Sequence, residues 1–289
     1  MNTIGFIGLG LMGEAMSKNI VSKFAGTVVV YDLNPDAVNH LVKCGALAAA
    51  SIGEVAQQAD VIISMVPRSE HVRDVYQHLL PHLHAGQVTI DMSTIDPSVS
   101  IEISREVAKA GAVMLDAPVV KSVPAAVKAE LGIYVGGDKT AWEKVKPVLA
   151  MMGNNQIHMG ENGQGLVMKI LHNLMVAGIQ NSVNEMLTTA DYYGIDKSAF
   201  HTAISYGGAA NWYLDSKINS LIAEDYRTAF SLQNMAKDVN IMKTLLQESG
   251  LTLPGVDVVK AVYDRGIDSG IGGEDFCATF KVVKGHSSK

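Results

Sequence analysis

The sequence is short of cysteine, of positive charge and of long apolar runs. Its two cysteines, Cys44 and Cys277, match no metal-ligand spacing, so we expect no metal site, no disulfide framework and a reducing cytoplasm. The formal net charge of −6 and the lack of a basic run argue against a nucleic-acid partner. No stretch reaches the roughly 18 apolar residues of a membrane span, and the glycine-broken start does not read as a secretion signal, so no membrane partner is expected.

The composition is that of a compact globular protein, with 48% hydrophobic and 18% charged residues in a chain of 289. This length suits one large domain or two smaller ones. The first half alternates short runs of β-branched residues with helix-like segments, which predicts an α/β fold with a doubly wound, mostly parallel sheet. We expect strands at residues 4–7, 27–31, 60–66, 88–92, 113–116, 132–135 and 156–159.

The second half has only helical periodicity, and the change comes at the glycine-rich run GENGQG, residues 160–165. We therefore predict one domain over residues 1–162 and an all-helical domain over 163–289. A long helix over 163–193, ended by Gly194, is expected to join them. Further helices are expected at 197–205, 211–222, 230–248 and 254–265, and the sequence leaves open whether the polar tail GHSSK is ordered.

The first strand runs into three glycines with the spacing G-x-G-x-x-G, and an amphipathic helix comes after them. In a dinucleotide-binding turn the first glycine makes the tight turn, the second lets a pyrophosphate approach the backbone, and the third packs the helix on the strand. Amides at the helix start then face the phosphate oxygens. The predicted cofactor loop comprises Gly8, Leu9, Gly10, Leu11, Met12 and Gly13.

Asp32 ends the second strand about 20 residues after this loop, where a ribose-binding carboxylate is expected. A carboxylate there accepts hydrogen bonds from ribose hydroxyls and repels a 2′-phosphate, which favours NAD over NADP. The alternative is a surface or helix-capping aspartate. Two later strand ends, at Pro67 and at Ser93 and Thr94, should reach the same crevice. Pro67 could instead only end its strand, and Thr94 could only cap the next helix.

Lys169 is the one formal cation between Glu161 and Glu185, in the apolar segment GQGLVMKILHN. One interpretation is a lysine whose ammonium group reaches solvent past its apolar neighbours, as most helical lysines do. The other is a lysine in a partly dry cleft, where the charged form is disfavoured and the pKa moves towards the range useful for proton exchange. The helix by itself leaves both open.

Five motifs together resemble the β-hydroxyacid dehydrogenase family, namely GFIGLGLMG, DMSTIDP, LDAPV, GQGLVMKILHN and MAKD. The resemblance covers nearly the whole chain and implies a Rossmann domain followed by an all-helical domain. It also implies that Lys169 is catalytic, that Asn173 one turn later holds the substrate, and that Lys237 lies on the cofactor side. Taken without the resemblance, Lys237 and Asp238 read as an ordinary solvated pair. The family further suggests a homodimer or homotetramer.

The chain departs from the family where D-x-P-V-S-G-G is usual, because it reads DAPVVKS from Asp116. Lys121 and Ser122 replace the two glycines, and this text is similar to the sulfolactaldehyde reductase branch. A lysine there could bind a strongly anionic end group, or it could be a solvated lysine at a helix start. His172 also departs from the usual asparagine and is expected to pack within its helix.

We therefore expect an NAD-dependent oxidoreductase that interconverts a small β-hydroxy acid and its semialdehyde. Lys169 would be the general acid and base; Ser93, Lys121, Ser122 and Asn173 would hold the substrate. Two other classes remain open: a non-catalytic, dinucleotide-bound interaction module, and an imine reductase with the same domain plan. A module without catalysis could tolerate loss of Lys169, and screening hydroxy acids against cyclic imines separates the two enzymes.

Overall fold

The computed structural model describes residues 1–286, which belong to two compact units, Met1–Lys169 and Ile170–Lys289. Helix α8 (Gln164–Tyr192) begins in the first unit and continues in the second. The predicted boundary after residue 162 lies just before this helix. Of the tail GHSSK, helix α13 (Thr279–His286) includes the first two residues, and 287–289 lie outside the described part.

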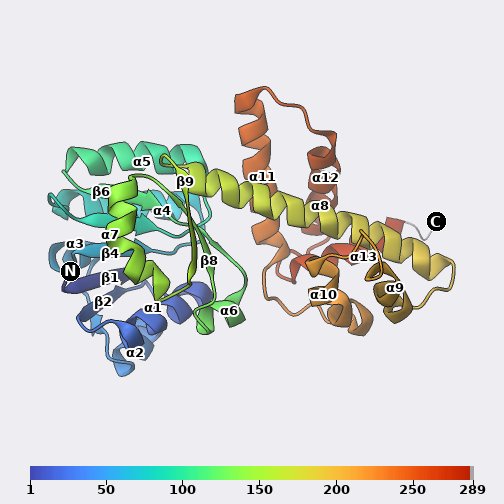
Figure 1. Ribbon diagram of the computed structural model, residues 1–289, viewed down its shortest axis with the longest axis horizontal. Coiled ribbons are helices and arrows are strands. Elements are labelled where there is room, and N and C mark those ends of the chain that lie inside the picture. Colours follow the sequence, from blue (N-terminus) through green and yellow to red (C-terminus); the bar gives the residue numbers. More distant parts are fainter. Residues whose placement is uncertain (287–289) are drawn as a thin grey trace. The chain divides into compact units, whose positions relative to one another are not determined.

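A nine-stranded sheet forms the centre of the first unit (Figure 1). Its order is β3-β2-β1-β4-β5-β6-β8-β7, and β9 pairs with β8. The six strands from β3 to β6 in this order are parallel, whereas β8 is antiparallel to β6, so the predicted mostly parallel sheet is confirmed. The strands are β1 (Thr3–Ile7), β2 (Thr27–Tyr31), β3 (Leu47–Ala48), β4 (Val61–Ser64), β5 (Val88–Asp91), β6 (Val113–Asp116), β7 (Val119–Val120), β8 (Gly132–Gly136) and β9 (Asn155–Gly160).

Helices cover both faces of this sheet, because successive side chains of a strand point to opposite faces and most strands are apolar on both. In β2, Val28 and Val30 belong to one buried cluster and Val29 to the other. This is the layered arrangement that the sequence predicts. The helices of the unit are α1 (Leu11–Lys23), α2 (Pro35–Lys43), α3 (Ile52–Gln58), α4 (Ser69–Leu79), α5 (Pro97–Lys109), α6 (Val123–Val127) and α7 (Lys139–Ala150), with a 3₁₀ turn at Leu80–His82.

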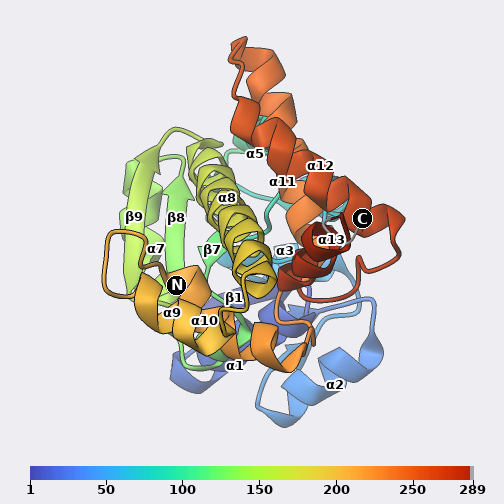
Figure 2. The ribbon, with the colours of Figure 1, turned by 90° about the vertical axis from the view of Figure 1, so that its right-hand side faces the viewer.

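The described part of the second unit is all helical, as predicted. Its core contains apolar residues of α8, α10, α11 and α12. Figure 2 shows α11 and α12 side by side. The helices after α8 are α9 (Lys197–Ile204), α10 (Trp212–Ala223), α11 (Leu232–Ser249), α12 (Pro254–Asp268) and α13, with a 3₁₀ turn at Phe276–Ala278. No helix in residues 1–286 is both long and apolar enough to cross a membrane.

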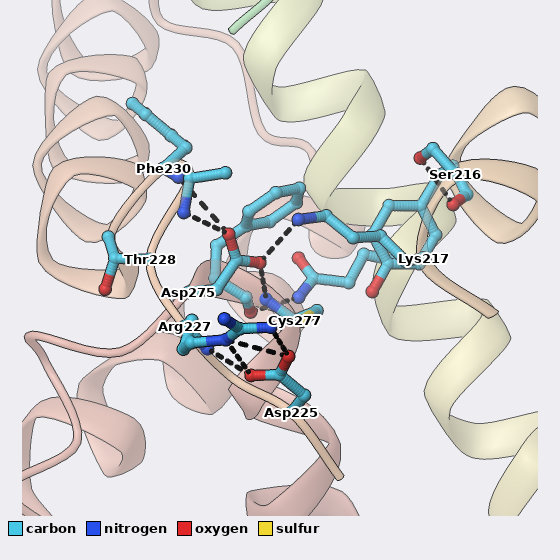
Figure 3. A network of polar contacts seen from close by, with 12 residues as sticks. Ser216, Lys217, Asp225, Arg227, Thr228, Phe230, Asp275 and Cys277 are labelled. Carbon is cyan, nitrogen blue, oxygen red and sulfur yellow. Dashed lines mark hydrogen bonds and ion pairs between the residues drawn. The ribbon is translucent and has the colours of Figure 1, made fainter. Parts of the chain in front are cut away.

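A buried aspartate fastens the loop before α11 to the segment before α13 (Figure 3). Asp275 is 1% exposed, accepts hydrogen bonds from the amides of Ala229 and Phe230, and pairs with Lys217 at 2.8 Å. The Lys217 hydrogen bond and the Cys277 amide hold the pKa of Asp275 below its usual value, against the opposing effect of burial. The ionised form therefore stabilises this unit.

Candidate functional site

The glycine loop has the geometry that a dinucleotide phosphate requires. Gly8 adopts φ +93°, and a Cβ there would lie 2.3 Å from the Met65 carbonyl oxygen. A Cβ at Gly13 would lie 1.9 Å from the Gly8 carbonyl oxygen, so only glycine lets α1 pack on this turn. Gly10, the N-cap of α1, has no protein atom within 4 Å of its would-be Cβ. That open side of the backbone fits the close approach of a pyrophosphate.

Asp32 is built into the same turn. One carboxylate oxygen accepts a hydrogen bond from the Leu9 amide at 2.5 Å, and the other accepts one from the Asn34 amide at 2.7 Å. Asn34, not Asp32, caps the following helix α2 through the Asp36 amide. A carboxylate accepts more than two hydrogen bonds, so Asp32 keeps capacity for ribose hydroxyls. The residues of this turn therefore fit NAD.

The ends of β4 and β5 are joined through Ser93, whose side chain is fully buried. Its hydroxyl donates to Asp91 at 2.7 Å and accepts from the Val66 amide at 2.9 Å, while Ser64 also donates to Asp91. In this arrangement Ser93 shapes the strand ends, and its direct contact with a substrate stays a prediction. Burial is the largest influence on Asp91 and raises the pKa of its carboxyl to about 6.

The neighbouring predicted residues also lie at these strand ends. Pro67 is exposed and comes after β4 has ended at Ser64, so it does not terminate that strand. Thr94 is half-buried, and Asp96 rather than Thr94 caps α5, through the Ser98 amide. The capping alternative for Thr94 is thus not realised, and its contact with the cofactor stays a prediction.

Lys169 is 9% exposed and belongs to the first unit. The helix that carries it starts against the carboxyl end of β6, where Asp116 accepts hydrogen bonds from the amides of Gly163 at 2.7 Å and Leu166 at 3.0 Å. The Asn162 side-chain amide adds a bond to the Met114 carbonyl at 2.8 Å. The lysine is therefore buried and close in sequence to a fixed helix start, not extended into solvent.

In the second unit, Asp238 brings together two of the predicted residues. It is 1% exposed, accepts a hydrogen bond from the Asn173 side-chain amide at 2.6 Å, and lies 3.3 Å from the ammonium group of Lys237. The alternative of a solvated Lys237–Asp238 pair is therefore not realised, and the contact of Lys237 with the cofactor stays a prediction. Because a carboxylate only accepts, it orients the Asn173 amide nitrogen towards itself and leaves the carbonyl oxygen as an acceptor for another group.

Lys121 lies on an exposed loop just after β7, with a backbone φ of +81° that few residues other than glycine adopt. It thus keeps a glycine-like conformation while carrying a long cationic side chain. Ser122 comes next as the half-buried N-cap of α6, with no side-chain capping bond. Strained backbone of this kind is concentrated at functional positions.

The sequence by itself does not identify Asp91, Asp116 and Asp238 as supports of the site. All three stand inside quoted motifs, Asp91 in DMSTIDP, Asp116 in LDAPV and Asp238 in MAKD, but nothing in the pattern says which distant groups a buried carboxylate will meet. His172 is half-buried on α8, as expected of a residue that packs along its helix.

Comparison with known proteins gives a consistent result over the whole chain. Residues 3–160 match the family described as the NAD binding domain of 6-phosphogluconate dehydrogenase. Residues 163–283 match the family described as the NAD-binding domain of NADP-dependent 3-hydroxyisobutyrate dehydrogenase. The chain is 33% identical to the NAD-dependent L-serine dehydrogenase of Pseudomonas aeruginosa, over 98% of both chains.

Solved structures agree. The Mycobacterium tuberculosis 3-hydroxyisobutyrate dehydrogenase with L-serine superposes with a TM-score of 0.92 at 28% identity, covering 98% of this chain and 99% of that one. The imine reductase of Myxococcus stipitatus gives 0.67 at 18% identity, covering 97% and 99%, which shows a shared fold alone. With its two matched domains and its full-length relatives, the chain belongs to the β-hydroxyacid dehydrogenase family of NAD-dependent oxidoreductases.

Proposed function

We propose that this protein interconverts a short β-hydroxy acid and its semialdehyde with NAD(H), with Lys169 as the general acid and base. The observation that carries the proposal is the burial of Lys169 in the first turns of α8, whose start is fastened to the carboxyl end of β6. Ligands of open α/β sheets bind outside the carboxyl ends of the strands. The helix that carries Lys169 therefore starts at the edge of the sheet where a dinucleotide is expected to bind, which supports a role for its amine in chemistry on that cofactor.

The chemistry depends on the position of this amine. A bound NADH supplies the hydride for reduction of the aldehyde carbon. The Lys169 ammonium would give its proton to the carbonyl oxygen as negative charge develops there, and the neutral amine would remove the hydroxyl proton in the reverse direction. The Asn173 carbonyl oxygen, left available by Asp238, would accept from a substrate hydroxyl.

The anionic end of the substrate is assigned to Lys121 and Ser122. The L-serine dehydrogenase and the 3-hydroxyisobutyrate dehydrogenase with L-serine act on or bind short β-hydroxy acids by their names, which supports a carboxylate. The lysine in place of glycine supports a more strongly charged terminus, such as a sulfonate, because a compact ammonium binds a concentrated anionic charge well. A screen of NADH consumption over semialdehydes with carboxylate, sulfonate and phosphate ends, beside cyclic imines, decides both the end group and the reaction class.

The test of the mechanism is Lys169→Ala. We expect kcat to fall by about 10²-fold or more while NADH titration stays near wild type, because proton transfer is lost and the glycine loop is untouched. The matched control is Lys243→Ala, which removes a helical lysine that pairs with Asp257 on the surface of the second unit and should keep kcat. Full activity of the Lys169→Ala variant would remove this residue from the mechanism.

We also keep a cytoplasmic location and a homodimer or homotetramer as proposals. Both cysteines are free thiols, Cys44 exposed and Cys277 buried, which suits a reducing compartment. Exposed apolar residues on α8, including Met175 and Met186, are candidates for a subunit interface. Light scattering of the purified protein tests the oligomeric state.

A further inference from the structure

Asp116 fills a cradle that only glycines could form around it. A Cβ at Gly136 would lie 2.5 Å from one of its carboxylate oxygens, and a Cβ at Gly165 would lie 2.8 Å from the other. The same Gly165 Cβ would also lie 2.6 Å from the Tyr134 carbonyl oxygen, so the first turn of α8 touches the strands directly. Gly163 has φ +91°, which lets the chain turn sharply into the helix.

Both carboxylate oxygens of Asp116 are used at the helix start. They accept from the amides of Gly163 and Leu166, which belong to the group of first-turn amides that has no partner within a helix. The cap is unusual because it comes from a strand 47 residues earlier in the chain, not from the residue before the helix. It therefore does more than stabilise the start of α8, because it also sets the position of that start relative to the sheet.

Burying a full carboxylate for this purpose is costly. Burial raises the pKa of Asp116 even though the backbone amides of Gly163 and Leu166 act in the opposite direction. A neutral or an exposed capping side chain would stabilise a helix start as well as a buried carboxylate does. Helix α7 has an exposed cap, because Asp138 accepts a hydrogen bond from the Ala141 amide at 2.7 Å. Helix α8 differs in carrying Lys169 only three residues after Leu166, within the next helical turn.

We propose that Asp116 is a positioning residue for Lys169, setting the place and direction of the ammonium group by pinning the first turn of α8 to the end of β6. This inference rests on the proposed function of Lys169. A displacement of about 1 Å at a reacting group can cost on the order of 10²-fold in rate. Loss of the hydrogen bonds between Asp116 and the first turn of α8 should therefore affect the chemical step, and not cofactor binding at the glycine loop.

The experiment compares Asp116→Asn with Asp138→Asn. Asparagine keeps the size of the side chain but offers one acceptor oxygen to two amides. For Asp116→Asn we expect kcat to fall by about 10- to 100-fold with an unchanged dissociation constant for NADH, and a displaced limb in the pH profile of kcat, since the environment of the Lys169 amine changes. Asp138→Asn should leave kcat and its pH profile as in wild type.

A second pair of variants covers the case in which Asp116→Asn fails to fold. Gly165→Ala keeps the carboxylate but pushes the first turn off the strands, and should lower kcat in the same way. Gly178→Ala lies on the same helix with nothing within 4 Å of the added Cβ, and should keep kcat. Normal kcat and an unmoved pH profile in Asp116→Asn or Gly165→Ala, in an enzyme that Lys169→Ala inactivates, would overturn the inference. Activity that survives Lys169→Ala overturns the proposed function instead.

Discussion

At the scale of single residues, the candidate site contains side chains held in positions that are costly for the fold. Lys121 takes a left-handed backbone conformation, which costs about 1–2 kcal/mol for a residue with a Cβ. The family resemblance gives glycine as the residue expected at this position. A chain that keeps the strain and exchanges glycine for lysine is consistent with a binding task for the ammonium group.

The first prediction concerns this strain. Lys121→Gly should stabilise the protein by about 0.5–1 kcal/mol, because the backbone conformation becomes favourable, and should raise KM for the anionic semialdehyde by about tenfold with little change in kcat. Thermal unfolding and steady-state kinetics measure the two effects. The control is Ala129→Gly, which relieves another positive φ, of 57°, nearby in the chain and should leave KM unchanged. An unchanged KM in Lys121→Gly would show that the lysine is merely solvated.

At the scale of elements, the joined ends of β4 and β5 contain a buried carboxyl that should make stability depend on pH. The pKa of Asp91 is raised to about 6, chiefly by burial, with a smaller contribution from the negative charge of Asp116. The native state therefore holds this proton more tightly than the unfolded chain, whose aspartates titrate near 4. The contribution of Asp91 to stability is complete below about pH 4 and is lost as pH rises to about 6.

The second prediction uses Asp91→Asn, which is neutral at every pH. Between pH 4 and 7 the free energy of unfolding of this variant, relative to wild type, should increase by about 1–3 kcal/mol. Urea unfolding at a series of pH values gives this difference. For Asp275→Asn the same difference should stay flat from pH 5 to 7, because the pKa of Asp275 is lowered and its contribution is lost only at more acid pH. A flat difference for Asp91→Asn would mean that its carboxyl is not destabilised by burial.

The elements also show what the sequence can predict. The strand predicted at 113–116 is observed at Val113–Asp116, and the long helix predicted at 163–193 is observed at Gln164–Tyr192, because strong periodicity and glycine signals mark them. The two-residue strands β3 and β7 are not predicted, since segments so short have no periodicity of their own. Helix α13 is not predicted either.

The site divides in the same way. The glycine loop, Asp32 and Lys169 carry local signals, either in spacing or in an unexpected charge. The buried aspartates that support them do not, because their partners lie tens of residues away, as with Asp116 and Gly163 or Asn173 and Asp238. Such pairings are set by the packing of strands and helices, which a single sequence does not reveal.

At the scale of the whole molecule, the two units have separate cores. The two buried clusters of the first unit contain no described residue beyond Leu166, and the cluster of the second unit contains none before Ile170. Each core thus gains its stability from its own burial, which permits the units to unfold at different temperatures. The glycine loop and Asp32, which fit NAD, belong to the first unit.

The third prediction is that calorimetry resolves two unfolding transitions, one for each unit. NAD at a hundredfold excess over its dissociation constant should increase the free energy of unfolding of the first unit by about 2.7 kcal/mol and so raise the midpoint temperature of its transition. NADP at the same concentration should raise this midpoint temperature less, because the Asp32 carboxylate repels the 2′-phosphate. In Asp32→Asn the difference between the effects of NAD and NADP should be smaller. Hydrogen exchange of β1 and α1 shows which of the two transitions belongs to the first unit. Leu246→Ala, in the core of the second unit, should lower the midpoint temperature of the other transition only. A greater rise with NADP than with NAD in wild type would show that Asp32 does not select the cofactor, and its carboxylate would then serve only to hold the Leu9 and Asn34 amides in place.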